Sequence, residues 1–162
     1  MRKLFLAILT VFLILSCISK PPAASNDQEQ LQRLLINTDV IAECMALIRP
    51  LSDYPNELID LIFAFSSAHP TEEILRITLN VSKTLYGLSD KIQRIDMDIA
   101  EYAKLNKAYI NGDSSVPVAD LMRRTEIILE KINSLQPDID AFAKVCDTLD
   151  NAMRRYNFEF TP

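Results

Sequence analysis

Glycine, histidine and tryptophan are the residues that this sequence uses least. Two glycines, one histidine and no tryptophan occur among 162 residues. So few glycines leave little material for the tight turns of β-hairpins or for the glycine-rich loops that hold phosphate groups. Residues common in helices (Leu, Ile, Ala, Lys, Arg, Glu and Gln) dominate instead, and this composition predicts an all-α fold.

The same scarcity limits the chemistry that the chain can perform. A nucleophile paired with histidine would have to use His69, which lies in a proline-containing turn and is expected to be a solvated or capping residue. Zinc needs a cluster of Cys and His, and a carboxylate-bridged di-metal site needs paired Glu-x-x-His motifs; the sequence has neither. Asp96, Asp98 and Glu101 form a charge run that we expect to be a solvated helix face and not an acid–base pair. We therefore expect no enzyme activity, no catalytic residue, no metal and no cofactor.

Basic residues are outnumbered by acidic ones. After residue 17 the chain holds 15 Lys and Arg against 22 Asp and Glu, a formal charge of −7. An acidic domain of this kind matches a phosphate backbone poorly, so we expect no nucleic acid partner. Apolar residues make up 49% of the chain, which is enough for one domain with a real core.

Residues 1–16 have the form of an export signal. Two basic residues precede an apolar run of about a dozen residues, which is too short to cross a bilayer because a spanning helix needs roughly 20. The tetrad Ile14-Leu15-Ser16-Cys17 is similar to the lipobox of bacterial lipoproteins, with an aliphatic residue three positions before the cysteine and a small one just before it. That resemblance covers the first 17 residues only.

The lipobox resemblance implies a lipid anchor on Cys17. In that class the signal is cut before the cysteine, the thiol is linked to diacylglycerol, and the new amine is acylated, for example with palmitate. Residues 17–26 would then be the lipidated cysteine with a short polar tether, and 27–162 the bundle domain. Ile18 replaces the Asp that retains some lipoproteins at the inner membrane, so the resemblance favours the outer membrane of the bacterial envelope. The alternative is an ordinary signal peptide cut after Ser19, which would release a secreted protein.

Apolar spacing predicts a first helical arm that is interrupted by prolines. Asp27 to Arg49 is expected to form a helix that Pro50 ends, followed by a loop or kink over 50–56. Glu57 to Ser67 is expected to form a short helix buried on most sides, because it is apolar on most sides. Thr71 is expected to cap the next helix after a turn at His69.

Two long apolar stripes follow, each with the heptad spacing of a coiled coil. The first predicts one helix from Thr71 to Ile110 that continues through Gly87. A loop over 111–116 leads to the second stripe, which runs from Val118 to Tyr156 and keeps its phase through Pro137. An unbroken phase predicts a kink at this proline and not a change of direction.

These segments predict an up-down-up bundle of three long, kinked helical arms. The alternative cuts the last arm at Pro137 and folds it back, which gives a four- or five-helix antiparallel bundle. The cysteines distinguish the two: with three arms, Cys44 and Cys146 are roughly 18 Å apart along the axis and stay free, whereas the folded-back bundle brings them to a similar height. Three arms therefore predict two free, buried thiols.

The sequence favours a lipid-anchored, non-enzymatic binding or scaffolding module with a protein partner of unknown identity. The alternative is a helical carrier of an apolar ligand, with helix 57–67 as its lid and Met45, Phe63, Phe65 and Tyr86 lining its pocket. Polar residues on the stripes (Thr78, Asn106 and Thr125) are expected to set the register, and the aromatic tail 156–160 is expected to pack on its own bundle.

Overall fold

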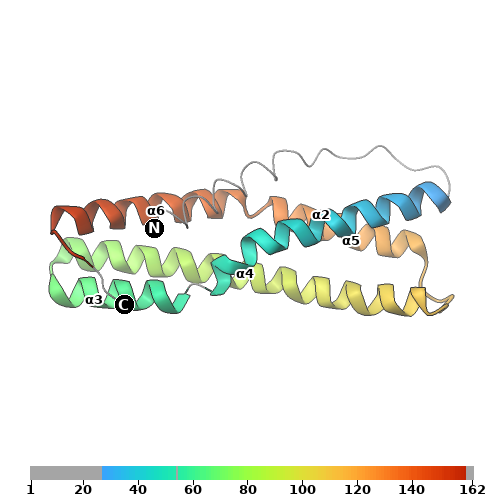
Figure 1. Ribbon diagram of the computed structural model, residues 1–162, viewed down its shortest axis with the longest axis horizontal. Helices are drawn as coiled ribbons and strands as arrows, with labels where there is room; N and C mark the ends of the chain where they lie inside the picture. Colours follow the sequence, from blue (N-terminus) through green and yellow to red (C-terminus); the bar gives the residue numbers. More distant parts are fainter. Residues whose placement is uncertain (1–26, 54, 160–162) are drawn as a thin grey trace.

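A computed structural model describes residues 27–53 and 55–159 (Figure 1). These residues form helices and loops, with no strand among them. The helices are α2 (Asp27–Asp53), α3 (Pro55–Ala68), α4 (Glu72–Ile110), α5 (Val118–Asn133) and α6 (Gln136–Arg155). The predicted all-α class is confirmed.

The helices form a rod of three arms that run up, down and up. The first arm is α2 followed by α3, the second is α4, and the third is α5 followed by α6 (Figure 1). One half of the rod, here called the proximal half, contains α2, α5 and the C-terminal half of α4; the distal half contains α3, α6 and the N-terminal half of α4. Because α6 continues along α4 in the direction of α5, the three-arm topology is confirmed and the folded-back alternative is wrong.

Helix α4 runs the length of the rod without a break, as the stripe predicts. The Thr71 hydroxyl accepts a hydrogen bond from the Ile74 N–H at 3.2 Å, and two glutamates in the first turn suit the helix dipole. At the other end Gly112 has φ of +88°, a conformation that glycine adopts without strain. Gly87 lies inside the helix and does not interrupt it.

The end of the first helix differs from the prediction. Pro50 does not terminate α2, which continues to Asp53. Proline removes one backbone hydrogen bond, but the extra turn places Leu51 in the core with 1% of its surface exposed. The Ser52 hydroxyl also donates to the Arg49 carbonyl at 2.7 Å. Burial of Leu51 therefore outweighs the missing bond.

The prediction that the short helix is buried on most sides is wrong. In α3 only one face is buried, through Leu61, Ile62 and Phe65, whereas Phe63 is 72% exposed. A three-arm bundle covers each helix on the side that faces the other two arms and leaves its outer side open. The sequence of α3 is more apolar than this position requires.

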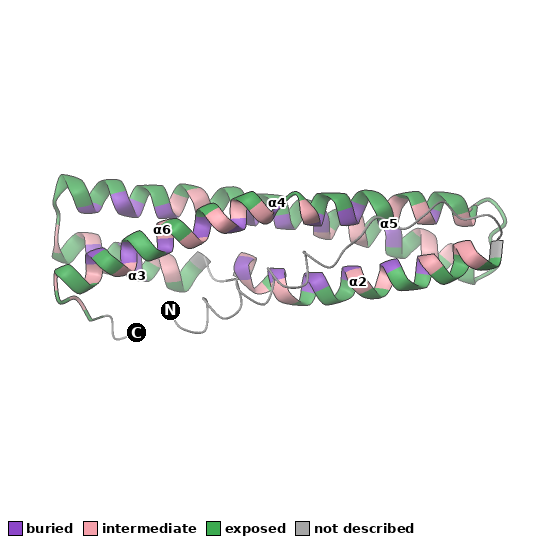
Figure 2. Cartoon of the chain, turned by 90° about the horizontal axis from the view of Figure 1, so that it is seen from above, coloured by how far each residue is buried: buried purple, intermediate pink, exposed green. Residues whose placement is uncertain are grey.

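The third arm bends where the sequence predicts. Helix α5 ends at Asn133 and α6 begins at Gln136, so that Pro137 lies in the first turn of α6, where its missing N–H costs nothing. Ile132, Leu135 and Ile139 are all buried on either side of the bend. The apolar stripe therefore passes through the bend and stays on the core (Figure 2).

Candidate functional site

The predicted lipidation site lies outside the described residues. Cys17, the signal 1–16 and the tether 17–26 all precede the first described residue. Within the described residues, none of the helices is long and apolar enough to cross a membrane. Helix α2, to which the tether would lead, begins at the proximal end of the rod.

The sequence predicted that His69 is a solvated or capping residue of a turn. In the structure it belongs to an aromatic cluster at the distal end. Its ring centroid lies 4.9 Å from that of Tyr156 and 5.6 Å from that of Phe65. Phe158 joins the cluster at 5.1 Å from Phe65. The predicted docking of the tail is thus confirmed for Tyr156 and Phe158, and Phe160 lies outside the described residues. The cluster closes the distal end by packing.

A polar layer crosses the proximal core. The Asn37 side-chain amide donates to the Thr125 hydroxyl at 3.1 Å, and the hydroxyls of Thr38 and Tyr102 are 2.7 Å apart. Asn37 and Thr38 therefore link α2 to α5 and to α4, respectively, at one level along the rod. Thr125 was expected to be such a layer residue. Asn37 was missed because it lies beside the apolar positions of α2 and not among them. Its place directly before Thr38, which makes two polar residues in a row, is the one feature of the sequence that could have indicated its role.

The other two polar stripe residues do not join the layer. Thr78 is buried, and its hydroxyl donates to the Ile74 carbonyl of its own helix at 2.9 Å. Asn106 is half-buried on α4. Within the described residues, neither the Thr78 hydroxyl nor the Asn106 amide bonds to another arm, so the register-setting role falls to the pairs that involve Asn37 and Thr38.

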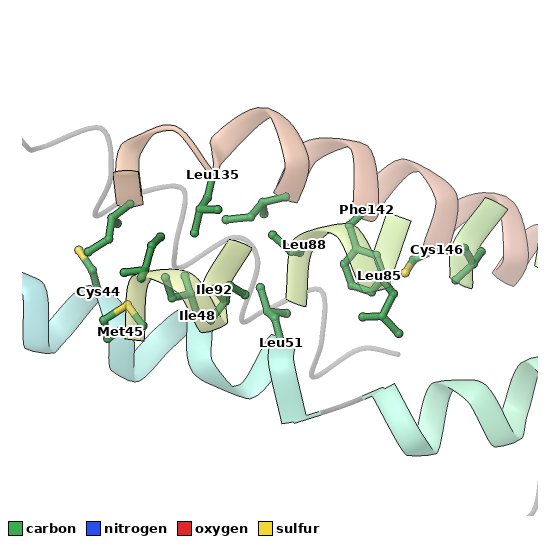
Figure 3. Packing of buried hydrophobic residues seen from close by; sticks show 14 of the residues in the cluster. Cys44, Met45, Ile48, Leu51, Leu85, Leu88, Ile92, Leu135, Phe142 and Cys146 are labelled. Carbon is green, nitrogen blue, oxygen red and sulfur yellow. The ribbon is translucent and has the colours of Figure 1, made fainter. Parts of the chain in front are cut away.

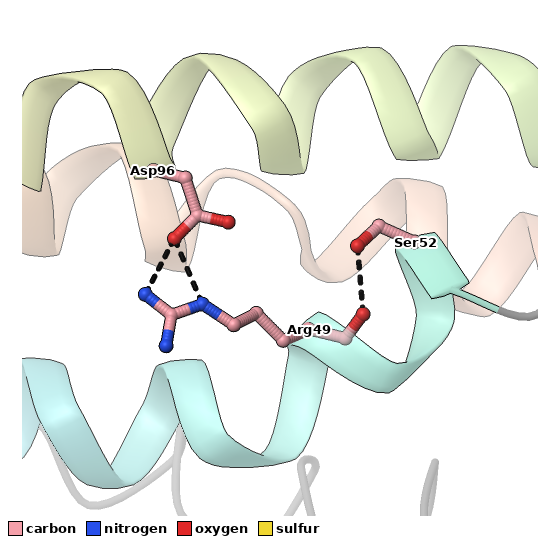
Figure 4. Close-up of polar contacts among 3 residues, drawn as sticks. All are labelled: Arg49, Ser52 and Asp96. Carbon is pink, nitrogen blue, oxygen red and sulfur yellow. Dashed lines mark hydrogen bonds and ion pairs between the residues drawn. The ribbon is translucent and has the colours of Figure 1, made fainter.

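The acidic run on α4 binds cations on the neighbouring arms and is more than a solvated face. Arg49 donates to one carboxylate oxygen of Asp96 through both Nε at 2.9 Å and Nη2 at 2.6 Å (Figure 4). Asp98 pairs with Lys131 at 2.5 Å. Glu101 pairs with Arg124 at 3.0 Å.

These pairs give the acidic run a structural role. Each carboxylate is bound to a cation from another arm, so the run links α4 to α2 and to α5. Such partly exposed pairs add at most about 1 kcal/mol each, but they favour one register between the arms.

The two remaining cysteines are free and buried, as the three-arm topology predicts. Only 2% of the surface of Cys44 and 7% of that of Cys146 is exposed. Burial raises the pKa of the Cys44 thiol, with a smaller contribution from Glu43, and burial followed by Asp147 raises the pKa of Cys146 to about 12. Figure 3 shows Ile92, Leu88 and Leu85 between the two sulfur atoms. Both thiols are therefore core residues whose burial disfavours the thiolate form.

Four exposed apolar side chains lie on α3 and α4 in the distal half, and we call them the distal apolar face. They are Phe63 (72% exposed), Leu75 (53%), Leu79 (70%) and Tyr86 (57%). The three residues of α4 lie within about 40° of one another around the helix, because successive residues turn by about 100°. They form one line along the outside of a helix whose inner side is already packed.

A basic groove adjoins this face. It lies between α4 and α6, has a volume of about 460 Å³ and is open to solvent. Arg76 and Lys83 line it together with Leu79, and neither cation has an ion-pair partner within 28–52 and 56–159. A second open hollow of about 510 Å³ lies between α4 and α5 and mixes Asp98 and Asp120 with arginines.

No group of three or more metal-ligating side chains occurs in the described part of the chain. Comparison of the sequence and structure with protein-family models, curated proteins and solved structures finds no match. The distal apolar face with its basic groove is therefore the candidate site that the geometry presents.

Proposed function

We propose that this chain is a lipid-anchored protein of the bacterial envelope that acts as a non-enzymatic binding or scaffolding module. The distal apolar face is the observation that carries the proposal. Three of its large apolar side chains are exposed in a line along α4, which is typical of a surface that another protein covers. The lipobox resemblance supports an anchor at Cys17, and Ile18 favours the outer membrane.

The rod would hold this face away from the membrane. Leu79 lies 31 residues before the proximal end of α4 at Ile110, a rise of about 46 Å along the helix. The distal apolar face could then bind a partner in the envelope that does not itself touch the lipid. Arg76 and Lys83 lie beside this face without an acidic partner among the described residues, so they favour a binding protein whose apolar contact surface is bordered by acidic residues.

The carrier alternative has less support. Of the residues expected to line its pocket, Met45 and Phe65 are at most 1% exposed within the packed core, whereas Phe63 and Tyr86 are turned to solvent. The four side chains therefore do not surround a common space. The helix expected to be a lid packs on α4 through its buried face.

The anchor is tested by Cys17→Ser. We expect this variant to lose acylation, seen by intact mass, and to leave the detergent phase on phase separation, because its tether carries no lipid. A Cys17→Ser chain that still partitions with membranes at unchanged processed mass would contradict the anchor.

The binding surface is tested by a photo-crosslinking residue at Tyr86 in native membranes, with Glu126 on the exposed side of α5 as the matched control position. We expect a discrete crosslinked species from Tyr86 only. A second change, Leu79→Asp, should abolish that species without lowering the melting temperature, since Leu79 is 70% exposed. Equal crosslinking from both positions, or insensitivity to Leu79→Asp, would contradict the proposal.

A further inference from the structure

The outer side of α4 in the distal half is nearly symmetric about the midpoint between Ser82 and Lys83. Leu79 lies as many residues before this point as Tyr86 lies after it, and both side chains are more than half exposed. Because successive residues turn by about 100°, these two side chains lie within about 20° of each other around the helix. Figure 2 shows α4 along one edge of the distal half, with α3 and α6 on the same side of it. A surface of this kind can face a second copy of itself.

The charged residues beside this line are complementary under the same symmetry. Arg76, before the midpoint, corresponds to Asp90 after it. Glu72 corresponds in the same way to Arg94, and each match holds to within one residue, about 1.5 Å along the helix. All four residues lie about 20–60° from Leu79 on the side of α4 that faces α6. A two-fold axis between antiparallel helices keeps this flank on one side, so each cation of one copy meets an acid of the other.

These charged groups are open to a partner from outside the chain. Arg76 and Glu72 are exposed and have no ion-pair partner in the described ranges. Asp90 and Arg94 pair with each other at 2.9 Å, but their side chains are 58% and 74% exposed. An antiparallel copy would therefore add ion pairs between groups that the monomer leaves in solvent.

Other arrangements of two copies match less well. In a parallel pair each flank of α4 faces the opposite flank of the other copy, and the flank away from α6 has no acidic residue between 72 and 94. An antiparallel pair shifted to place Leu75 opposite Met97, which is 72% exposed, would bring Glu72 against Glu101. The charges therefore favour the antiparallel register about the midpoint given above.

The contact is small, so we expect a weak dimer. From Glu72 to Arg94 the facing helices overlap by about 33 Å, and a strip about 10 Å wide covers roughly 330 Å² on each copy. A standard interface covers about 800 Å² per partner. Lys83 also lies beside the two-fold axis and faces its own copy, which weakens the contact further. The monomer therefore dominates in dilute solution.

We propose that the distal apolar face binds a second copy of this chain, with α4 antiparallel to α4 and Leu79 against the partner's Tyr86. The ion pairs described above then form across the two-fold axis, each of them twice. The inference rests on the proposed binding function of this face, and it names a second copy as the protein that covers it. The two proximal ends point in opposite directions in this dimer.

The test is disulfide trapping between two introduced cysteines. One chain carries Leu79→Cys and the other Tyr86→Cys, and both begin at residue 17 with Cys17→Ser. Cys44 and Cys146 stay in place, because only 2% and 7% of their surfaces are exposed. The two chains are mixed in equal amounts and oxidised by air with copper phenanthroline, and intact mass identifies each disulfide dimer.

We expect the mixed dimer to exceed either dimer of like chains at least about fivefold, because only the mixed positions face each other within the approximate 7 Å that a disulfide allows between Cα atoms. Like positions lie about 10 Å apart along the axis in the proposed register. The proportions that random pairing gives, or an excess of dimers of like chains, would overturn the inference.

A charge reversal tests the register. Adding Arg76→Glu to both chains should lower the yield of the mixed dimer about fivefold, the equivalent of ~1 kcal/mol, and adding Asp90→Arg as well should restore it. Glu126→Arg on the exposed side of α5 is the matched control and should leave the yield unchanged. A yield that does not respond to Arg76→Glu would contradict the ion pairs and with them the proposed register.

The failure of this inference is distinguishable from a failure of the proposed function. Random disulfide pairing, together with a photo-crosslinked species from Tyr86 whose mass is not twice that of the chain, would overturn the inference and leave the binding function standing. Random pairing with no crosslinked species from Tyr86 would overturn both.

Discussion

At the scale of single residues, two adjacent side chains on α2 determine how the arms face one another. Asn37 bonds to the third arm and Thr38 to the second, through groups that are largely buried. An apolar core accepts many registers, whereas a buried amide is satisfied in only one. We infer that this layer selects the register of the proximal half.

Thr125→Val tests the layer. The change leaves the buried Asn37 amide without its acceptor at nearly constant volume, so it should lower the free energy of unfolding by about 1–3 kcal/mol in urea melts. The double variant Asn37→Leu with Thr125→Val should recover most of this loss, because both polar groups are then absent. A single change within about 0.5 kcal/mol of the parent would show that the hydrogen bond does not matter for stability.

We expect Cys146 to make the free energy of unfolding fall at alkaline pH. Its pKa in the folded chain is about 12 against an ordinary value of 9.0, so the neutral thiol is the form that folding favours. The contribution of the neutral thiol to the free energy of unfolding is fully present below the pKa of the unfolded chain, and it is lost as the pH rises from 9.0 towards 12. Urea melts across this interval should show a smaller loss for Cys146→Ala than for the parent. Parallel pH dependence of the two proteins would contradict the prediction.

At the scale of elements, α4 shows how much of the fold follows from local pattern. Its cap at Thr71, its uninterrupted stripe and its end before Gly112 could all be predicted, because a cap, a period and a left-handed glycine act within a few residues. Pro50 could not be interpreted in the same way. Whether a proline ends a helix depends on what the next turn buries, and Leu51 meets its partners only in the tertiary structure.

Gly87→Ala should stabilise the protein. Gly87 lies inside α4, is exposed, and a Cβ added there meets no atom within 4 Å. Alanine should therefore raise the free energy of unfolding by about 0.5–1 kcal/mol through its higher helix propensity. Gly112→Ala is the control and should destabilise, since φ at this position is +88°. Chemical denaturation of both variants measures the difference; a loss of stability for Gly87→Ala would contradict the helix interior assigned to it.

At the scale of the whole molecule, the central arm holds the other two through charge as well as core packing. The ion pairs between arms within the described ranges all include a residue of α4. In the distal half Lys91 binds Asp138 and Arg155 binds Glu73. The pairs therefore extend over both halves of the rod and oppose sliding of one arm along another.

The rod makes a prediction for small-angle X-ray scattering. The 39 residues of α4 span about 58 Å, so three arms of this length packed side by side have a radius of gyration of about 19 Å. A compact domain of the same chain length has about 15 Å. We expect the larger value for the chain from Cys17 onward. A value near the smaller one would contradict the extended three-arm topology in solution.

The sequence by itself determined the helices and the inner faces of α4, α5 and α6, because helix period and capping depend on spacing along one chain. It also contains the lipobox resemblance at Cys17, which remains a prediction. The tertiary structure decided which apolar residues stay outside. Phe63 and Phe65 are the same residue type in the same helix, yet Phe63 is 72% exposed and Phe65 is 0% exposed. The reason is physical: three arms can cover only the inner side of each helix, and which residues of an apolar segment face inward depends on its partners.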